Sequence, residues 1–159
     1  MYKRILVAID GSETSNLGLR HAIQLAKEQH AQLRLVHALD NVVVESETYA
    51  EMTDLWNARK KSGQALLQKA RSLAAKAAIE PETKLLESET FGQRIADSIV
   101  EEAERCRADL IVLGTHGRRG LSHVFLGSVA EGVVRISTTP VLLIRGLAGK
   151  PKRRRSRSR

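Results

Sequence analysis

The stretch GTHGRRGLSHVFLGS contains glycines at Gly114, Gly117, Gly120 and Gly127. A glycine lets the backbone approach a ligand closely or turn with a positive φ, because it has no Cβ atom. The backbone amides at the start of a helix attract anions, so Gly127, Ser128 and Val129 could donate successive N–H groups to a phosphate. This spacing therefore points to phosphate binding by the backbone and by the Ser128 hydroxyl.

Asp10 is the second candidate, because it directly follows the apolar run RILVAI of residues 4–9. A carboxylate repels phosphate, but it accepts hydrogen bonds from ribose hydroxyls or from the amino group of adenine. Taken separately, Asp10 could simply cap a helix, and the glycines could serve only the shape of a loop. Together they favour a purine nucleotide that lies across the ends of the strands.

The histidines and arginines nearby admit simpler interpretations. His116 and His123 are seven residues apart, and no carboxylate or cysteine lies at ligand spacing. We therefore expect solvated loop residues rather than a metal site or a catalytic base. His37 could contact a ligand, although a histidine at a strand end more often bonds within the protein. Arg118 and Arg119 either steer an anionic ligand or form a solvated basic turn.

No motif of a familiar enzyme class accompanies the glycines. The chain contains neither a GxxxxGK[ST] phosphate loop nor a GxSxG nucleophile elbow, and the glycine loop has no lysine to reach a transferred phosphate. We therefore assign no catalytic residue and no metal ligand, and predict a binding module. A slow Mg²⁺-dependent ATPase, or autophosphorylation at Ser128, stays open because Mg²⁺ can bind through the phosphates of the nucleotide.

The elements that would position these residues alternate along the chain. Short apolar runs rich in branched residues predict strands covered on both faces, and segments with a period near 3.6 residues predict helices. Ser12 can cap the first helix, and residues 40–53 have no clear period and are interpreted as a loop that could contain helical turns. The predicted strands cover residues 4–9, 32–39, 83–88, 109–114 and 141–145, and the predicted helices cover 14–30, 54–78, 91–106 and 128–137.

Strands that alternate with helices of crossover length predict an α/β fold, namely a single doubly wound five-stranded parallel sheet, Rossmann-like, with helices on both faces. Such sheets bind ligands beyond the carboxyl ends of their strands, where the strand order reverses. Gly114 ends a predicted strand and Ser128 begins a helix. The glycine stretch is therefore a strand-to-helix loop on the ligand side, with Asp10 across the crevice.

The composition of the 159 residues is that of one globular domain, with 42% hydrophobic and 28% charged residues. No apolar run approaches the roughly 20 residues of a membrane-spanning helix, and the apolar run near the amino terminus is too short for a signal peptide. We therefore expect a cytoplasmic protein without membrane contact. Cys106 is the single cysteine, which excludes an internal disulfide and favours a reduced packing residue.

The net charge of +8 comes from one end of the chain. The last ten residues, KPKRRRSRSR, hold seven of the 26 basic residues, and the other 19 nearly balance 18 acidic ones. Residues 148–159 are therefore predicted to be a disordered basic tail, and residues 1–147 to be the nucleotide-binding domain. The tail is either a solvated end or a salt-dependent contact for nucleic acid or another polyanion.

Three separated segments resemble the universal stress protein family. The spacing of Gly114, Gly117, Gly127 and Ser128, with two and then nine residues between the glycines, is similar to the nucleotide-binding signature of that family. The opening ILVAIDGSETS and the closing GSVAEGVVRISTTPVLLIR resemble its two ends, so the resemblance covers residues 2–146. It implies an adenine nucleotide alpha hydrolase-like fold and the branch of the family that binds ATP.

The resemblance also implies a partner, a ligand and a role. The last strand, Val141 to Arg145, would pair with the same strand of a second chain to form a homodimer. ATP would be the cofactor, optionally with Mg²⁺ on its phosphates, and its binding would order the glycine loop of a regulatory protein that presents this state to partners during stress. The residues carried over are Ala8, Asp10 and Val36 on the adenosine side, Leu113 and Gly114 beside the ribose, and Gly117, Gly127, Ser128 and Val129 at the phosphates.

Two features depart from the family pattern. Gly132 lies inside the predicted helix that begins at Ser128, where a better helix former is usual. It would loosen that helix by about 1 kcal/mol relative to alanine. The basic tail lies beyond the usual end of the family and could add a partner.

Overall fold

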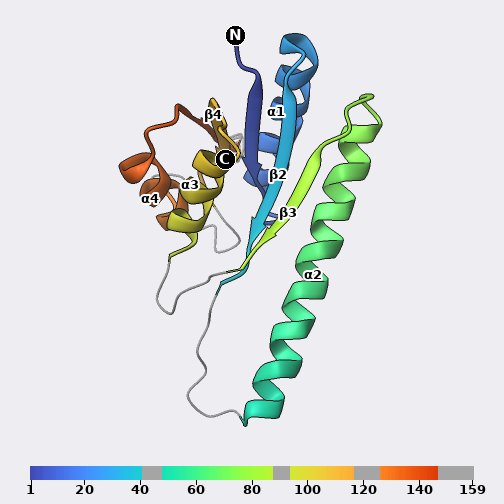
Figure 1. Ribbon diagram of the computed structural model, residues 1–159, viewed down its shortest axis with the longest axis vertical. Helices are drawn as coiled ribbons and strands as arrows, with labels where there is room; N and C mark the ends of the chain where they lie inside the picture. Colours follow the sequence, from blue (N-terminus) through green and yellow to red (C-terminus); the bar gives the residue numbers. More distant parts are fainter. Residues whose placement is uncertain (41–47, 88–93, 117–125, 147–159) are drawn as a thin grey trace, which may run out of the picture.

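The computed structural model describes residues 1–40, 48–87, 94–116 and 126–146. Within these residues, strands and helices alternate along the chain (Figure 1). The elements are β1 (Arg4–Ala8), α1 (Glu13–Gln29), β2 (Gln32–Ala38), α2 (Tyr49–Ala75), β3 (Glu82–Leu86), α3 (Ile95–Arg105), β4 (Leu110–Gly114), α4 (Ser128–Ile136) and β5 (Val141–Ile144).

The five strands form one parallel sheet in the order β3-β2-β1-β4-β5. The chain runs outward from β1 to β3, returns to the other side of β1 with β4, and continues outward to β5. The strand order therefore reverses between β1 and β4. This doubly wound five-stranded parallel sheet confirms the predicted fold class, and it places a ligand crevice at the carboxyl ends of those two strands.

Helices cover both faces of the sheet, with α2 on one side and α3 and α4 on the other in Figure 1. Side chains alternate between the two faces along each strand. Ile5 and Val7 of β1 belong to the core that includes buried residues of α1 and α2, whereas Leu6 of β1 and Ile111 of β4 belong to the core shared with α3 and α4. Burial on both faces explains the continuous apolar runs.

The start of α2 differs from the prediction. The helix begins at Tyr49 and not at residue 54, because Thr48 and Glu51 form a capping box in which the Thr48 N–H donates to the Glu51 carboxylate at 2.9 Å. The amino-terminal part of α2 extends beyond the end of the sheet (Figure 1), and Tyr49 is 88% exposed. Exposed helical turns show no apolar period, which is why the sequence pattern there predicts a loop that could contain helical turns.

Two other helix boundaries differ by more than one residue. α2 ends at Ala75 rather than at residue 78. α3 begins at Ile95, since Arg94 has the extended backbone of a cap residue. The predicted start of α3 at residue 91 lies outside the described residues, as do residues 148–159 of the basic tail and the predicted domain boundary at residue 147.

Gly132 lies where α4 packs against α3. A Cβ atom at this position would lie 2.7 Å from the Cβ of Ala96, a separation that real Cβ atoms do not adopt. The glycine that we expected only to weaken α4 therefore also lets the two helices approach closely. None of the described helices combines the length and apolarity that a membrane crossing requires.

Candidate functional site

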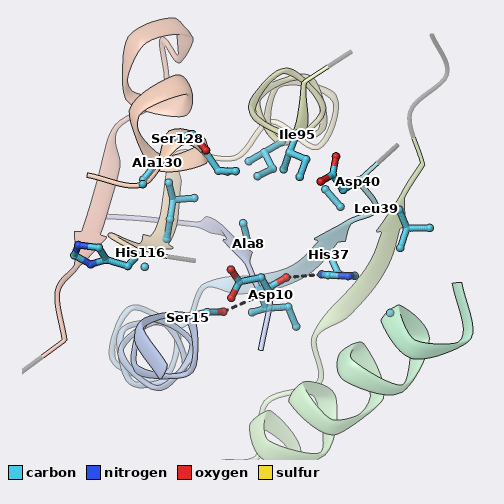
Figure 2. Close-up of a pocket in the computed structure, with 18 of the residues that line it drawn as sticks. Ala8, Asp10, Ser15, His37, Leu39, Asp40, Ile95, His116, Ser128 and Ala130 are labelled. Carbon is cyan, nitrogen blue, oxygen red and sulfur yellow. Dashed lines mark hydrogen bonds between the residues drawn. The ribbon is translucent and has the colours of Figure 1, made fainter. Parts of the chain in front are cut away.

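A cavity of about 630 Å³ opens at the carboxyl ends of β1, β2 and β4 (Figure 2). This volume suits a small ligand or cofactor. Residues that follow these strands line it, the first turn of α4 forms one end, and α2 and α3 form further walls. The lining residues are Ala8, Ile9, Asp10, Ser15, His37, Ala38, Leu39, Asp40, Arg59, Ser62, Gly63, Ile95, Ile99 and residues 113–116 and 126–130.

Asp10 follows β1 and lies on the cavity wall (Figure 2). Its backbone N–H donates to the Ser15 hydroxyl at 3.0 Å, and its carboxylate accepts from the N–H of Ser12 at 2.8 Å. Ser12 is the N-cap of α1, as predicted, because its hydroxyl accepts from the N–H of Ser15 at 3.2 Å. Asp10 is therefore not the helix cap, and its carboxylate is a fixed acceptor beside the cavity.

His37 near the end of β2 is buried, and its Nδ1 lies 2.7 Å from the backbone carbonyl of Ile9. A carbonyl oxygen only accepts, so Nδ1 carries the proton and donates. The interpretation of His37 as a histidine hydrogen-bonded within the protein is thus confirmed, although the residue also lines the cavity. This bond joins the ends of β1 and β2 below the cavity.

Val36 occupies a different place from the one expected. It is fully buried in the core shared with α3 and α4 and is absent from the cavity wall, whereas Ala38 lines it. Both side chains lie on the same face of β2, because side chains repeat every second residue. However, Val36 is paired with Ala8, the last residue of β1, and Ala38 lies beyond that end. Of these two residues, Ala38 therefore reaches the cavity and Val36 does not.

Gly114 ends β4 on the cavity wall, together with Leu113. A Cβ atom on Gly114 would lie 2.5 Å from the Thr14 hydroxyl oxygen and 2.7 Å from the backbone nitrogen of Ser15. The first turn of α1 therefore requires a glycine here. The resemblance places Gly114 beside the ribose, and the structure shows that the protein's own helix already occupies the space of a side chain there.

His116 is tied into the protein rather than solvated. Its Nδ1 lies 2.8 Å from the Thr115 hydroxyl, and its side chain is partly buried. The backbone carbonyl of His116 accepts hydrogen bonds from the hydroxyls of Ser12 and Thr14 on α1. The expectation of a solvated loop residue is therefore wrong for His116, because hydrogen bonds from the start of α1 fix the backbone where the glycine loop begins. His123, Arg118, Arg119 and Gly117 lie outside the described residues.

The amino terminus of α4 forms the end of the cavity beyond β4. Gly127 is its N-cap, but the Gly127 N–H donates to the carbonyl of Thr115 at 2.8 Å. This corrects the expectation that the Gly127 amide is open to a phosphate. The N–H of Glu131 makes a helical bond to the carbonyl of Gly127 at 2.8 Å.

The amides of Ser128, Val129 and Ala130 precede Glu131 in α4, so they have no acceptor within the helix. All three residues line the cavity, and Figure 2 shows Ser128 at its upper edge. Together with the helix dipole, these amides make this end of the cavity suited to an anion. Ala130 was missed from the sequence, although its place in the first turn of a predicted helix was a usable signal.

Other walls come from elements that carry no motif. Arg59 of α2 donates from Nη1 to the backbone carbonyl of Asp40 at 3.0 Å, and both residues line the cavity. Ile95 and Ile99 of α3 supply apolar surface on another side. Among the residues that the structure describes, no three His, Cys, Asp or Glu side chains gather closely enough to hold a metal ion.

The fold and the cavity define an α/β sheet protein with a cavity of small-ligand size at its switch point. Residues 1–145 match the family model described as the Universal stress protein family, and the chain belongs to this family. Universal stress protein MJ0531 of Methanocaldococcus jannaschii is 36% identical over 156 residues, a match that covers 96% of this chain and 85% of that protein. The family predicted from the sequence is therefore confirmed.

Solved structures of the family share the fold. The universal stress protein from Archaeoglobus fulgidus in complex with dAMP is 28% identical, with a TM-score of 0.62 and coverage of 90% of this chain and 98% of that chain. A universal stress protein in complex with cAMP is 29% identical, with a TM-score of 0.66 and coverage of 90% and 97%. In both of those structures the bound molecule is an adenine nucleotide.

Proposed function

We propose that this chain binds an adenine nucleotide in the cavity, with ATP as the ligand, and acts as a nucleotide-sensing regulatory protein. The observation that carries the proposal is the first turn of α4, where the amides of Ser128, Val129 and Ala130 border the cavity without helical acceptors. The complexes of related proteins with dAMP and cAMP support an adenine nucleotide as the anion.

The order of the strand ends suggests how the nucleotide lies. The phosphates bind at Ser128 and Val129, and the ribose lies beside Asp10, whose carboxylate can accept from its hydroxyls. The base lies beyond β1, near Ala8 and Ala38. Because β2 continues to Ala38 while β1 ends at Ala8, the backbone of Ala38 has no β1 residue opposite it and is open to a base edge.

The residues of the proposed site are thus close to those carried over from the family, with Ala38 in place of Val36. Leu113 and Gly114 lie between the ribose and the phosphates on the cavity wall. Gly127 contributes as the helix cap, and Gly117 remains assigned to the phosphates by resemblance. We infer sensing rather than rapid catalysis, because backbone amides hold an anion but move no proton. A Mg²⁺ ion would be carried by the phosphates of the nucleotide.

The proposed homodimer forms through β5 and Arg145. β5 is an edge strand with four apolar residues, of which Leu142 is 36% exposed. An apolar edge strand needs cover, and a second copy of the strand supplies it. Sedimentation velocity tests this: a dimer that Leu142→Lys converts to a monomer supports the interface, and a monomeric wild type contradicts it.

The first experiment identifies small molecules released by denaturing freshly purified protein and measures AMP and ATP binding by isothermal titration calorimetry. Ser128→Pro removes one amide N–H at the first position of α4, where proline is tolerated. Gly127 before it already has the extended backbone that proline requires, with ψ of 149°. We expect this variant to bind nucleotide about tenfold more weakly, since a charge-assisted hydrogen bond is lost.

Ser128→Ala is the matched control, because it removes the hydroxyl and keeps the amide. It should lose less affinity than Ser128→Pro. The proposal is wrong if the wild type neither carries an adenine nucleotide nor binds one at millimolar concentration. If the wild type and a folded Ser128→Pro variant bind nucleotide with equal affinity, the first turn of α4 does not contribute to the site.

A further inference from the structure

The end of the cavity away from α4 is built by β2 and α2. Asp40 lies two residues beyond the end of β2 and lines the cavity. Arg59 of α2 donates a hydrogen bond to the backbone carbonyl of Asp40 at 3.0 Å, which fixes the chain segment that carries the carboxylate. Figure 2 shows the Asp40 side chain directed toward Ile95 of α3, across this end of the cavity.

The sheet order places three polar features in a row. The amides of α4 follow β4, Asp10 follows β1, and Asp40 follows β2, and these strands are neighbours in the order β4, β1, β2. A nucleotide has the same order of phosphate, ribose and base. If the phosphates bind at α4 and the ribose lies at Asp10, the outer edge of the base lies toward Asp40.

We propose that Asp40 is a specificity-determining residue that accepts a hydrogen bond from the 6-amino group of adenine, and that Arg59 is the residue that positions it. This inference rests on the proposed function. Adenine carries an amino donor at position 6, whereas guanine and hypoxanthine carry a carbonyl acceptor there. A carboxylate accepts hydrogen bonds and cannot donate them, so Asp40 favours adenine and opposes a 6-carbonyl.

The expected preference is modest, because Asp40 is an exposed residue at the edge of the cavity. A hydrogen bond to a charged group is worth more than a neutral one, but water screens an exposed charge. We therefore expect AMP to bind about tenfold more tightly than IMP, which differs from AMP in the group at position 6 and in the proton on N1. Both probes carry the same ribose and phosphate, so α4 and Asp10 contribute equally to each.

The test measures the affinities of AMP and IMP for the full chain by calorimetry. Asp40→Asn introduces an amide N–H that can donate to the 6-carbonyl, so the AMP-to-IMP preference should fall to about one through weaker AMP and stronger IMP binding. Glu104→Gln is the matched control, because it removes one negative charge from the exposed carboxyl-terminal turn of α3 and should keep the wild-type preference. Arg59→Met should lower the preference part of the way.

Each outcome decides between the two proposals. A wild-type preference that disappears in Asp40→Asn and persists in Glu104→Gln supports the assignment. Equal binding of AMP and IMP by the wild type, or an unchanged preference in a folded Asp40→Asn variant, overturns it while leaving the nucleotide site intact. If Arg59→Met keeps the AMP-to-IMP preference, Arg59 does not position Asp40, and the assignment of Asp40 itself stands. If neither AMP nor IMP binds, the proposed function itself fails, and the base assignment fails with it.

Discussion

The two ends of the sheet use polar groups in opposite ways. Near the amino ends of the strands, the carboxylate of Glu102 is fully buried and accepts hydrogen bonds from Arg34, from Lys84 at 2.7 Å and from Arg105 at 3.1 Å. At the carboxyl ends, the first-turn amides of α4 border a cavity without helical acceptors. One end satisfies its polar groups within the protein, and the other presents them to a cavity.

The ion pairs of Glu102 show how polar groups are satisfied at the amino ends of the strands, which we call the closed end of the sheet. Burial alone would raise the pKa of Glu102, but hydrogen bonds from Lys84 and Arg34 outweigh it, so the pKa lies below its ordinary value of 4.5. Arg34 lies on β2, Lys84 on β3 and Glu102 on α3, and the cluster therefore joins three elements. We expect substitutions here to change stability without changing ligand affinity, and substitutions of Asp10 and Ser128 at the cavity to do the reverse.

The largest effect is expected for Glu102→Gln. The variant keeps the shape of the side chain but removes the buried charge, and it leaves Arg34, Lys84 and Arg105 without their shared partner. We expect the free energy of unfolding to fall by about 3 kcal/mol, near the lower end for broken buried pairs because the three cations are partly exposed. Urea denaturation measures it, with Glu104→Gln as an exposed control on the same helix. Equal losses in both variants would contradict the role of the cluster.

Gly114→Ala should produce the next largest loss of stability, about 2 kcal/mol, because the added methyl group would overlap atoms of Thr14 and Ser15. Gly18→Ala is the matched control. A Cβ on Gly18 would have its nearest contacts at 3.7 Å, and Gly18 lies within α1. This substitution should be neutral or stabilising because alanine favours helix. If thermal melts show Gly114→Ala to be as stable as the wild type, the close approach of α1 does not restrict this position.

Asp10→Asn tests whether a polar residue at the carboxyl ends of the strands contributes to ligand affinity rather than to stability. The asparagine carbonyl can still accept from the N–H of Ser12, so the turn before α1 is kept and stability should change by less than about 0.5 kcal/mol. Loss of the negative charge should weaken AMP binding about tenfold, since a carboxylate accepts more strongly than an amide. Calorimetry and a thermal melt on the same sample test both parts. A large loss of stability with unchanged affinity would place Asp10 with the structural residues.

The sheet could be predicted from the sequence, because strands buried on both faces show as apolar runs and the loop after Gly114 marks the end of one of them. The start of α2 could have been found from Thr48 and Glu51, a capping-box pair at the right spacing. The hydrophobic pattern does not show it because residues 49–55 are exposed, and apolar periodicity reports only packed faces.

Much of the cavity wall could not be predicted, because it depends on distances between elements. Whether Val36 or Ala38 reaches the cavity depends on where β1 ends relative to β2. Arg59 lines the cavity because α2 lies close to the end of β2, and no local sequence motif identifies this residue. The Gly127 amide is likewise taken by Thr115, a contact that spacing alone does not reveal. Sequence spacing located the cavity, and packing decided which atoms face it.

The smallest effect expected is the pH dependence of the Glu102 contribution. A carboxyl group whose pKa is lowered by folding stabilises the protein fully above its unfolded value, near 4.5, and loses this contribution as the pH falls through the folded pKa. The difference in unfolding free energy between the wild type and Glu102→Gln should therefore be constant above about pH 5 and shrink below it. Urea denaturation at a series of pH values measures this difference, and the other carboxylates cancel because both proteins share them. A difference that persists undiminished in acid would show that the glutamine disturbs packing, and that the closed end of the sheet is held by shape rather than by charge.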